Sequence, residues 1–185
     1  LAIGEEAALL SPATYEEQVA LRDEPASDAR DQYTLILRAQ GAAAGPDGDA
    51  AAGDIVGGIL VEYDPKGATM AGRMSVVSPT WRGRGLGRVL LRGQEALGRG
   101  LGARSVWGLV ELDNLSQQHL LESQGFWRCG IVPESDQRRD EEGRTHYVPE
   151  ALYIKPLVPP GDLLWPQRDQ LTDDVAGLFA LLPWP

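Results

Sequence analysis

The sequence contains a single cysteine, Cys129, so no disulfide can form within the chain, and this is typical of a reducing compartment. The N-terminal stretch LAIGEEAALL is acidic and lacks the basic cluster of a secretory signal. No apolar stretch approaches the roughly 20 residues that a membrane-spanning helix needs. We therefore expect a cytoplasmic protein without a membrane partner, and we interpret Cys129 as a small packing residue rather than a nucleophile.

Several motifs of familiar enzyme classes are also missing. The patterns HExxH, CxxC and GxSxG do not occur, and neither do GxxxxGK[ST] and GxGxxG. Basic residues are outnumbered, with 17 Lys and Arg against 27 Asp and Glu and a formal net charge of −10. A general nucleic-acid-binding surface needs clustered cations. The sequence therefore predicts no metal centre, no serine-hydrolase site and no nucleic-acid partner.

The pattern of apolar residues indicates one domain with extensions in these 185 residues. Alternating or continuous apolar runs predict six strands, at 33–40, 54–63, 68–78, 105–112, 126–132 and 147–157. Apolar spacings of three and four predict helices at 86–101 and 115–124, and a short helix in the tail.

Two segments have compositions typical of loops. The small residues of 41–53 predict a mobile loop, and the mixed charges of 133–146 predict a flexible loop that could border a pocket. We expect a main domain over 1–158, with its core at about 33–157. We expect 159–185 to be a C-terminal extension that packs on this domain or crosses to a second subunit as a dimer arm.

The segment 73–104 is basic although the chain is acidic, because it holds seven arginines and one glutamate. This predicts a site for an anionic ligand, although a helix with solvated arginines would have the same composition. The pentapeptide GRGLG occurs here twice, at 83–87 and 98–102. The first copy precedes a predicted helix, whose unpaired N–H groups and dipole favour an anion. The second copy is expected to end that helix.

The stretch VVSPTWRGRGLGRVLLRGQEALGRG at 76–100 resembles the acetyl-CoA signature [R/Q]xxGx[G/A] of the GCN5-related N-acetyltransferase (GNAT) family. A second stretch, NLSQQHLLESQGF, is similar to the family's Asn-led helix that closes with Gly-Phe. The resemblance covers about residues 33–157. It implies an α/β (α+β) fold with a mixed, mostly antiparallel central sheet flanked by helices, and a splayed pair of strands at the acyl-CoA site.

This resemblance implies an N-acetyltransferase that takes acetyl-CoA as co-substrate and transfers the acetyl group directly to a primary amine of a small molecule or peptide. The cofactor-binding residues that it implies lie on the splayed strand, the glycine loop and the Asn-led helix. They are Ser75, Val76 and Val77, then Arg82, Gly83, Arg84, Gly85, Leu86, Gly87 and Arg88, and finally Asn114 and Ser116. The Val77 N–H is also expected to stabilise negative charge on the thioester oxygen.

The sequence departs from the family at the two catalytic positions. The usual tyrosine, seven residues after the Asn, is Leu121 here, and the strand at 68–78 has no glutamate. We therefore expect Glu111 to be the general base, with Glu62 as the next candidate. The leaving thiolate could instead be protonated by water or by a hydroxyl such as that of Ser116 or Tyr147, and Tyr147 is our catalytic candidate.

These departures leave other functions open. One is a non-catalytic acyl-CoA-binding or sensing module on the same fold, and another is an interaction protein with a vestigial glycine loop. His119 and His146 rank behind the carboxylates as bases, because a lone surface histidine is usually only polar. The acidic composition favours a cationic acceptor amine without identifying it.

Overall fold

The computed structural model describes residues 30–39, 43–45, 48–50, 53–162, 164 and 166–182. The strands of its main sheet are β1 (Asp31–Arg38), β4 (Ile55–Asp64), β5 (Thr69–Val77), β6 (Ser105–Glu111), β7 (Trp127–Arg139) and β8 (Thr145–Pro156). Its α-helices are α2 (Leu86–Leu101), α3 (Leu115–Ser123) and α4 (Asp173–Ala180). Single 3-10 turns are η2 (Pro79–Trp81), η3 (Pro160–Asp162) and η4 (Arg168–Gln170).

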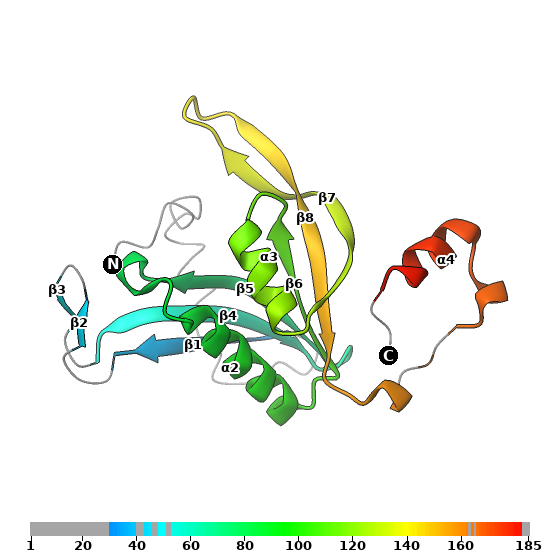
Figure 1. The fold of residues 1–185 in the computed structure, drawn as a ribbon, viewed down its shortest axis with the longest axis horizontal. Coiled ribbons are helices and arrows are strands. Elements are labelled where there is room, and N and C mark those ends of the chain that lie inside the picture. The colour runs from blue at the N-terminus through cyan, green and yellow to red at the C-terminus, as the bar shows by residue number, and fades with distance from the viewer. Residues whose placement is uncertain are drawn as a thin grey trace.

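The main sheet has the strand order β1-β4-β5-β6-β8-β7 (Figure 1). Only β5 and β6 run parallel, and the other neighbouring strands are antiparallel. The predicted strands and helices are present, and their ends are shifted by only one or two residues except at the C-terminal end of β7. The expected mixed, mostly antiparallel sheet flanked by helices is therefore confirmed.

Helices α2 and α3 lie on the same face of the sheet (Figure 1). Gly93 lets α2 approach β1 closely, since a Cβ there would lie 3.2 Å from Cδ1 of Leu35. The helix ends at Gly102, whose φ of 83° is left-handed and suits glycine. This confirms that the second GRGLG ends the helix.

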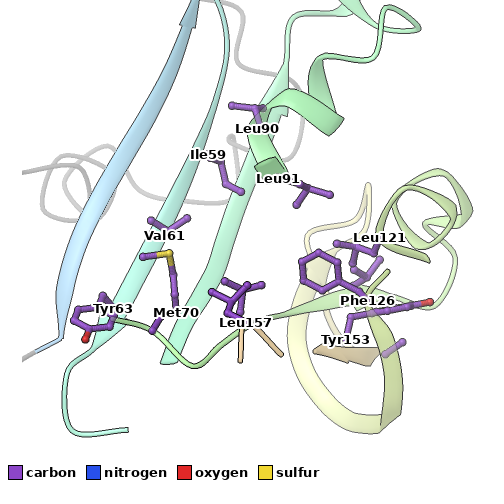
Figure 2. Close-up of a cluster of buried hydrophobic side chains, with 14 residues drawn as sticks. Ile59, Val61, Tyr63, Met70, Leu90, Leu91, Leu121, Phe126, Tyr153 and Leu157 are labelled. Atoms are coloured by element: carbon purple, nitrogen blue, oxygen red, sulfur yellow. The ribbon is translucent and has the colours of Figure 1, made fainter. Parts of the chain in front are cut away.

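The core fills the space between these helices and the sheet (Figure 2). Figure 2 shows Leu121 and Phe126 beside Tyr153 as one part of it. Core residues from the strands include Val61 and Tyr63 of β4, Val106 and Val110 of β6, and Ala151 and Tyr153 of β8.

The face of the sheet opposite α2 and α3 carries three glutamates. Successive side chains of a strand point to opposite faces. Glu62, Glu111 and Glu150 each adjoin a core residue in the sequence. Their side chains therefore lie on the face away from the two helices.

The segment 41–53 contains a small two-stranded sheet. Strands β2 (Ala43–Gly45) and β3 (Gly48–Ala50) pair antiparallel. Residues 41, 42, 46, 47, 51 and 52 lie outside the described residues, so the mobility of this segment stays a prediction.

The prediction of a flexible loop over 133–146 is wrong. Strand β7 continues to Arg139 and β8 starts at Thr145, so the two strands form a hairpin with a short turn. Its pairs include Arg138 with His146 and Gln137 with Tyr147. A two-stranded arm can expose both faces to water, so its strands lack the apolar alternation that marks a strand in sequence.

The C-terminal extension forms the predicted short helix, α4, whose N-cap Thr172 accepts a hydrogen bond from the Val175 N–H. Figure 1 shows α4 apart from the main sheet, and Leu178 and Leu181 are exposed. The boundary at 158/159 and the role of this extension as a packing or dimer arm stay predictions. Residues 1–29, Trp165 and Trp184 lie outside the described residues. No helix in the described ranges is long and apolar enough to cross a membrane.

Candidate active site

The central feature of the site is a gap between β5 and β6. These strands pair only from Thr69 to Gly72 on β5 and from Ser105 to Gly108 on β6. Beyond that point β5 stays paired with β4 as far as Val77, while β6 stays paired with β8 as far as Glu111. The two parallel strands therefore splay apart, as expected.

A β-bulge at the start of the gap accounts for the separation. Leu60 of β4 pairs with Met74 and Val61 pairs with Gly72, so Arg73 is an extra residue on β5. A bulge bends its strand and increases the local twist. Because the bulge directly follows Gly72, it turns the end of β5 away from β6.

Backbone groups of β5 are directed into this gap. The Ser78 N–H donates to the Val56 carbonyl at 2.9 Å. Hydrogen-bonded pairs alternate along an antiparallel ladder, so Val76 bonds with Gly58 of β4. The N–H groups of Ser75 and Val77 therefore point away from β4, toward the gap.

The glycine loop lies between the end of β5 and α2. Gly83 and Gly85 have φ values of 74° and 78°, and a Cβ on either would meet nothing within 4 Å. Gly85 is the N-cap of α2. No described residue accepts a hydrogen bond from the backbone N–H groups of residues 83–87. The loop thus offers unpaired donors at the positive end of a 16-residue helix, an arrangement that binds phosphate.

The arginines of 73–104 do not form one cluster. Arg82 Nε donates to the Val77 carbonyl at 3.1 Å, and the Arg84 guanidinium lies 4.8 Å from the centre of the Trp81 ring. Arg88 is exposed on the first turn of α2. By contrast, Arg99 donates to the Leu157 carbonyl at the other end of the helix. Of the arginines in 73–104, only Arg82, Arg84 and Arg88 adjoin the glycine loop.

Asn114 caps the N-terminus of α3. Its Oδ1 accepts hydrogen bonds from the Gln117 N–H at 3.2 Å and from Ser116 Oγ at 3.1 Å. Asn114 follows the end of β6, across the gap from the end of β5. Its Nδ2 group has no partner among the described hydrogen bonds.

Both sequence-derived candidates for the base are paired with arginine. Glu111, at the end of β6, forms an ion pair with Arg138 of β7. Glu62 of β4 lies 3.4 Å from Arg73 Nε and 3.2 Å from Arg30. Each of these carboxylates therefore already has a cationic partner.

The other candidate groups lie farther from the gap. Tyr147 is on the β7–β8 hairpin, 60% exposed. His146 bonds the Asp140 carboxylate at 2.8 Å, and this contact is the main cause that lowers the Asp140 pKa to about 2. His119 is exposed on α3. Leu121, at the position of the family's tyrosine, is buried in the core.

Sequence reasoning missed two buried polar residues near the gap, Gln94 and Glu150. Gln94 lies in α2 against Gly72, and none of the described residues forms a hydrogen bond with its amide nitrogen. Glu150 lies in β8 directly opposite Glu111. Gln94 stands within the apolar stripe of a helix, and Glu150 stands within the apolar run of a predicted strand, so both positions carried a signal for burial. Among the described residues no cluster of His, Cys, Asp or Glu could hold a metal ion.

Comparison with known proteins gives one family and many similar folds. The model of the Acetyltransferase (GNAT) family matches residues 10–126. A GCN5-related N-acetyltransferase from Kribbella flavida is 21% identical with a TM-score of 0.57, covering 80% of this chain and 78% of that one. The ribosomal-protein-S18-alanine N-acetyltransferase from Escherichia coli is 17% identical with a TM-score of 0.56, covering 84% and 83%.

An N-acetyltransferase from Staphylococcus aureus has a TM-score of 0.51 at 18% identity, covering 60% of this chain and 66% of that one. At these identities the similarity shows the fold alone. No curated protein sequence matches the chain.

Proposed function

Because this chain belongs to the acetyltransferase (GNAT) family, we propose that it is an N-acetyltransferase that takes acetyl-CoA as its acyl donor. The observation that carries the proposal is the gap between β5 and β6, with the N–H groups of Ser75 and Val77 facing it. The acceptor is a primary amine of a small molecule or peptide.

The described residues fit the donor. An extended amide chain such as pantetheine can pair with an unpaired strand edge as an added strand would, and β5 offers such an edge at 73–77. The unpaired N–H groups of 83–87, with Arg84 and Arg88 beside them, suit the pyrophosphate. Asn114 Nδ2 faces the pantetheine arm from the β6 side in this proposal, with Ser116 supporting it.

The bound thioester supplies the acetyl group, and the chain's own residues assist the transfer. The amine nitrogen forms a bond to the thioester carbonyl carbon as the carbon–sulfur bond breaks. A carboxylate takes the proton of the ammonium group first, because only the neutral amine is nucleophilic. The Val77 N–H stabilises the charge on the carbonyl oxygen. The thiolate takes up, through Tyr147 or water, the second proton that the nitrogen loses as the amide forms. The sequence-derived candidate for the base, Glu111, lies paired with Arg138 at the end of β6.

A second candidate, an acyl-CoA-binding module without catalysis, is favoured by one observation. Leu121 is a core residue packed with Phe126 and Tyr153, so the family's usual hydroxyl is replaced by a structural side chain. This module would bind acetyl-CoA but transfer its acetyl group to no amine.

Thermal denaturation with and without acetyl-CoA tests donor binding. A ligand at about 100 times its dissociation constant adds roughly 2.7 kcal/mol, which raises Tm by about 5–10 °C at roughly 2–4 °C per kcal/mol. ATP and NAD serve as control ligands. The double variant Arg84→Glu, Arg88→Glu should lose most of the shift, while Arg92→Glu, farther along α2, should keep it. Full acetyl-CoA affinity in the double variant would show the site assignment to be wrong.

Release of free CoA in the presence of amines separates the two candidates. The probes are spermidine, an aminoglycoside and a peptide with a free N-terminus. Release that depends on one of these amines supports the transferase, whereas binding of acetyl-CoA without release for any of them supports the module.

A further inference from the structure

Glu150 is the only buried carboxylate among the described residues, at 9% exposure. Its Oε2 accepts a hydrogen bond from Ser135 Oγ at 2.6 Å. It forms no ion pair with any described residue, in contrast to Glu62 and Glu111. A buried carboxylate with only a hydroxyl partner is costly to ionise, so its presence needs an explanation.

An irregularity in β7 places the hydroxyl over Glu150. Val132 pairs with Glu150 and Asp136 pairs with Val148, so residues 133–135 bulge out opposite Pro149. Glu134 within the bulge has a φ of 55°, which a residue with a Cβ adopts only at some cost. Bulges occur often beside active sites, where they redirect a side chain.

The strand register places Glu150 level, along the strands, with the position proposed for the thioester. Gly72 and Gly108 form the last β5–β6 pair. Because Arg73 bulges out, three ladder positions further along the two strands stand Val76, next to Val77, and Glu111. Glu111 pairs with Glu150 on β8. The carboxylates of both glutamates lie on the face away from α2 and α3. An amine approaching from that face would meet them beside the gap.

The charges around the two glutamates differ. Arg138 pairs with Glu111 and also bonds Asp113 at 3.0 Å, so the Glu111 carboxylate already has a cationic partner. Around Glu150, burial is the largest effect and raises the pKa of its carboxyl.

Other groups that face Glu150 change the pKa of its carboxyl, some upward and some downward. The hydrogen bond from Ser135 lowers the pKa of Glu150, and Arg73 of β5 lowers it slightly. The negative charges of Asp136 and Glu111 raise it. The net result is a more basic carboxylate than an ordinary glutamate, as a general base near neutral pH requires.

We propose that Glu150, rather than Glu111, accepts the proton of the acceptor amine in the transfer described above. This rests on the proposed function. The ammonium N–H proton passes to a carboxylate oxygen of Glu150, and Ser135 orients that carboxylate. The nitrogen lone pair then forms the bond to the acetyl carbon as the carbon–sulfur bond breaks. The departing thiolate takes up the second proton that the nitrogen releases, through Tyr147 or water.

The test compares Glu150→Gln with Glu111→Gln, using acetyl-CoA and the amine that the wild-type protein acetylates. Glu150→Gln should lower kcat/KM by about 100-fold or more, the usual contribution of a general base. The acidic limb of its pH–rate profile should disappear, while its affinity for acetyl-CoA stays unchanged. Glu111→Gln should stay within a few-fold and keep that limb.

Ser135→Ala provides a second readout that does not depend on whether Glu150→Gln folds. Removing the hydrogen bond that lowers the Glu150 pKa should move the acidic limb to higher pH, an effect that a purely structural role would not produce. Three results would each overturn the inference and leave the proposed function standing. They are a wild-type-like pH–rate profile for Glu150→Gln, an acidic limb that does not move in Ser135→Ala, and loss of that limb in Glu111→Gln. A wild-type protein that binds acetyl-CoA but acetylates none of the amines overturns both.

Discussion

Gln94 of α2 lies against Gly72 of β5, with its amide nitrogen 3.2 Å from the position that a Cβ on residue 72 would occupy. Gln94 is 2% exposed, and this nitrogen has no hydrogen-bond partner in the part of the chain that the structure describes. Gly72 and Gly108 form the last pair before β5 and β6 separate. An unsatisfied donor therefore lies at the closed end of the gap.

Replacing Gln94 with leucine should stabilise the protein. A buried donor without a partner costs about 1–3 kcal/mol, and leucine has a similar volume without that cost. We expect Tm to rise by about 2 °C or more, at roughly 2–4 °C per kcal/mol. The control is Arg92→Leu, on the exposed side of the same helix, which should change stability by less than about 0.5 kcal/mol. A lower Tm for Gln94→Leu would mean that its amide has a stabilising partner.

Replacing Gly85 with alanine should weaken the glycine loop. Its φ of 78° is left-handed, and a residue with a Cβ pays roughly 1–2 kcal/mol there. We expect lower stability and weaker acetyl-CoA binding, measured by thermal denaturation and calorimetry. Gly100→Ala is the matched control, since Gly100 lies within α2 with nothing near its Cβ position, and should stabilise the helix by roughly 0.5–1 kcal/mol. Equal effects of the two substitutions would contradict this role of Gly85.

Truncating Leu121 should destabilise the core beneath α3. Leu121 is 5% exposed and belongs to the main core cluster, and such Leu→Ala changes cost about 2–5 kcal/mol. Leu115→Ala on the same helix is the control because Leu115 is 62% exposed. Urea denaturation of both variants measures the difference. A loss below 1 kcal/mol for Leu121→Ala would argue against its place in the core.

Glu150 should make stability depend on pH. Burial raises the folded-state pKa of Glu150 above its ordinary value, so the folded protein binds its proton more tightly than the unfolded chain does. Its contribution is therefore most favourable below the pKa of the unfolded chain and is lost as pH rises through the folded-state pKa. Glu150→Gln should gain stability relative to wild type between pH 5 and 8, measured by urea denaturation along that range. A constant difference across the range would show that the Glu150 pKa is not raised.

The elements that sequence patterns predicted depend on residues close together in the chain. The apolar stripe from Leu86 to Leu101, the left-handed Gly102 and the N-cap Asn114 all act within a turn or two of helix. The glycine loop is also a local feature, because N–H groups at the start of a helix such as α2 have no partner within the helix. The same local patterns carried the resemblance to the acetyltransferase family.

Two predictions from the charge pattern failed because they depend on where residues lie in space rather than in the sequence. Seven arginines in 73–104 suggested one anion site, but a 16-residue helix is about 24 Å long and separates Arg88 from Arg104. The polar segment 133–146 indicated a loop, yet it pairs as a hairpin whose Arg138 binds Glu111, 27 residues away.

The sequence by itself determined the order of strands and helices, the glycine loop and the family, because these depend on local spacing and short motifs. Only the tertiary structure decided that Arg73 forms a bulge where β5 leaves β6, and that Glu111 pairs with Arg138. It also placed Glu150 beneath Ser135. Burial and ion pairing, which set the basicity of a carboxylate, depend on which distant segments meet across the sheet, and no local pattern encodes that.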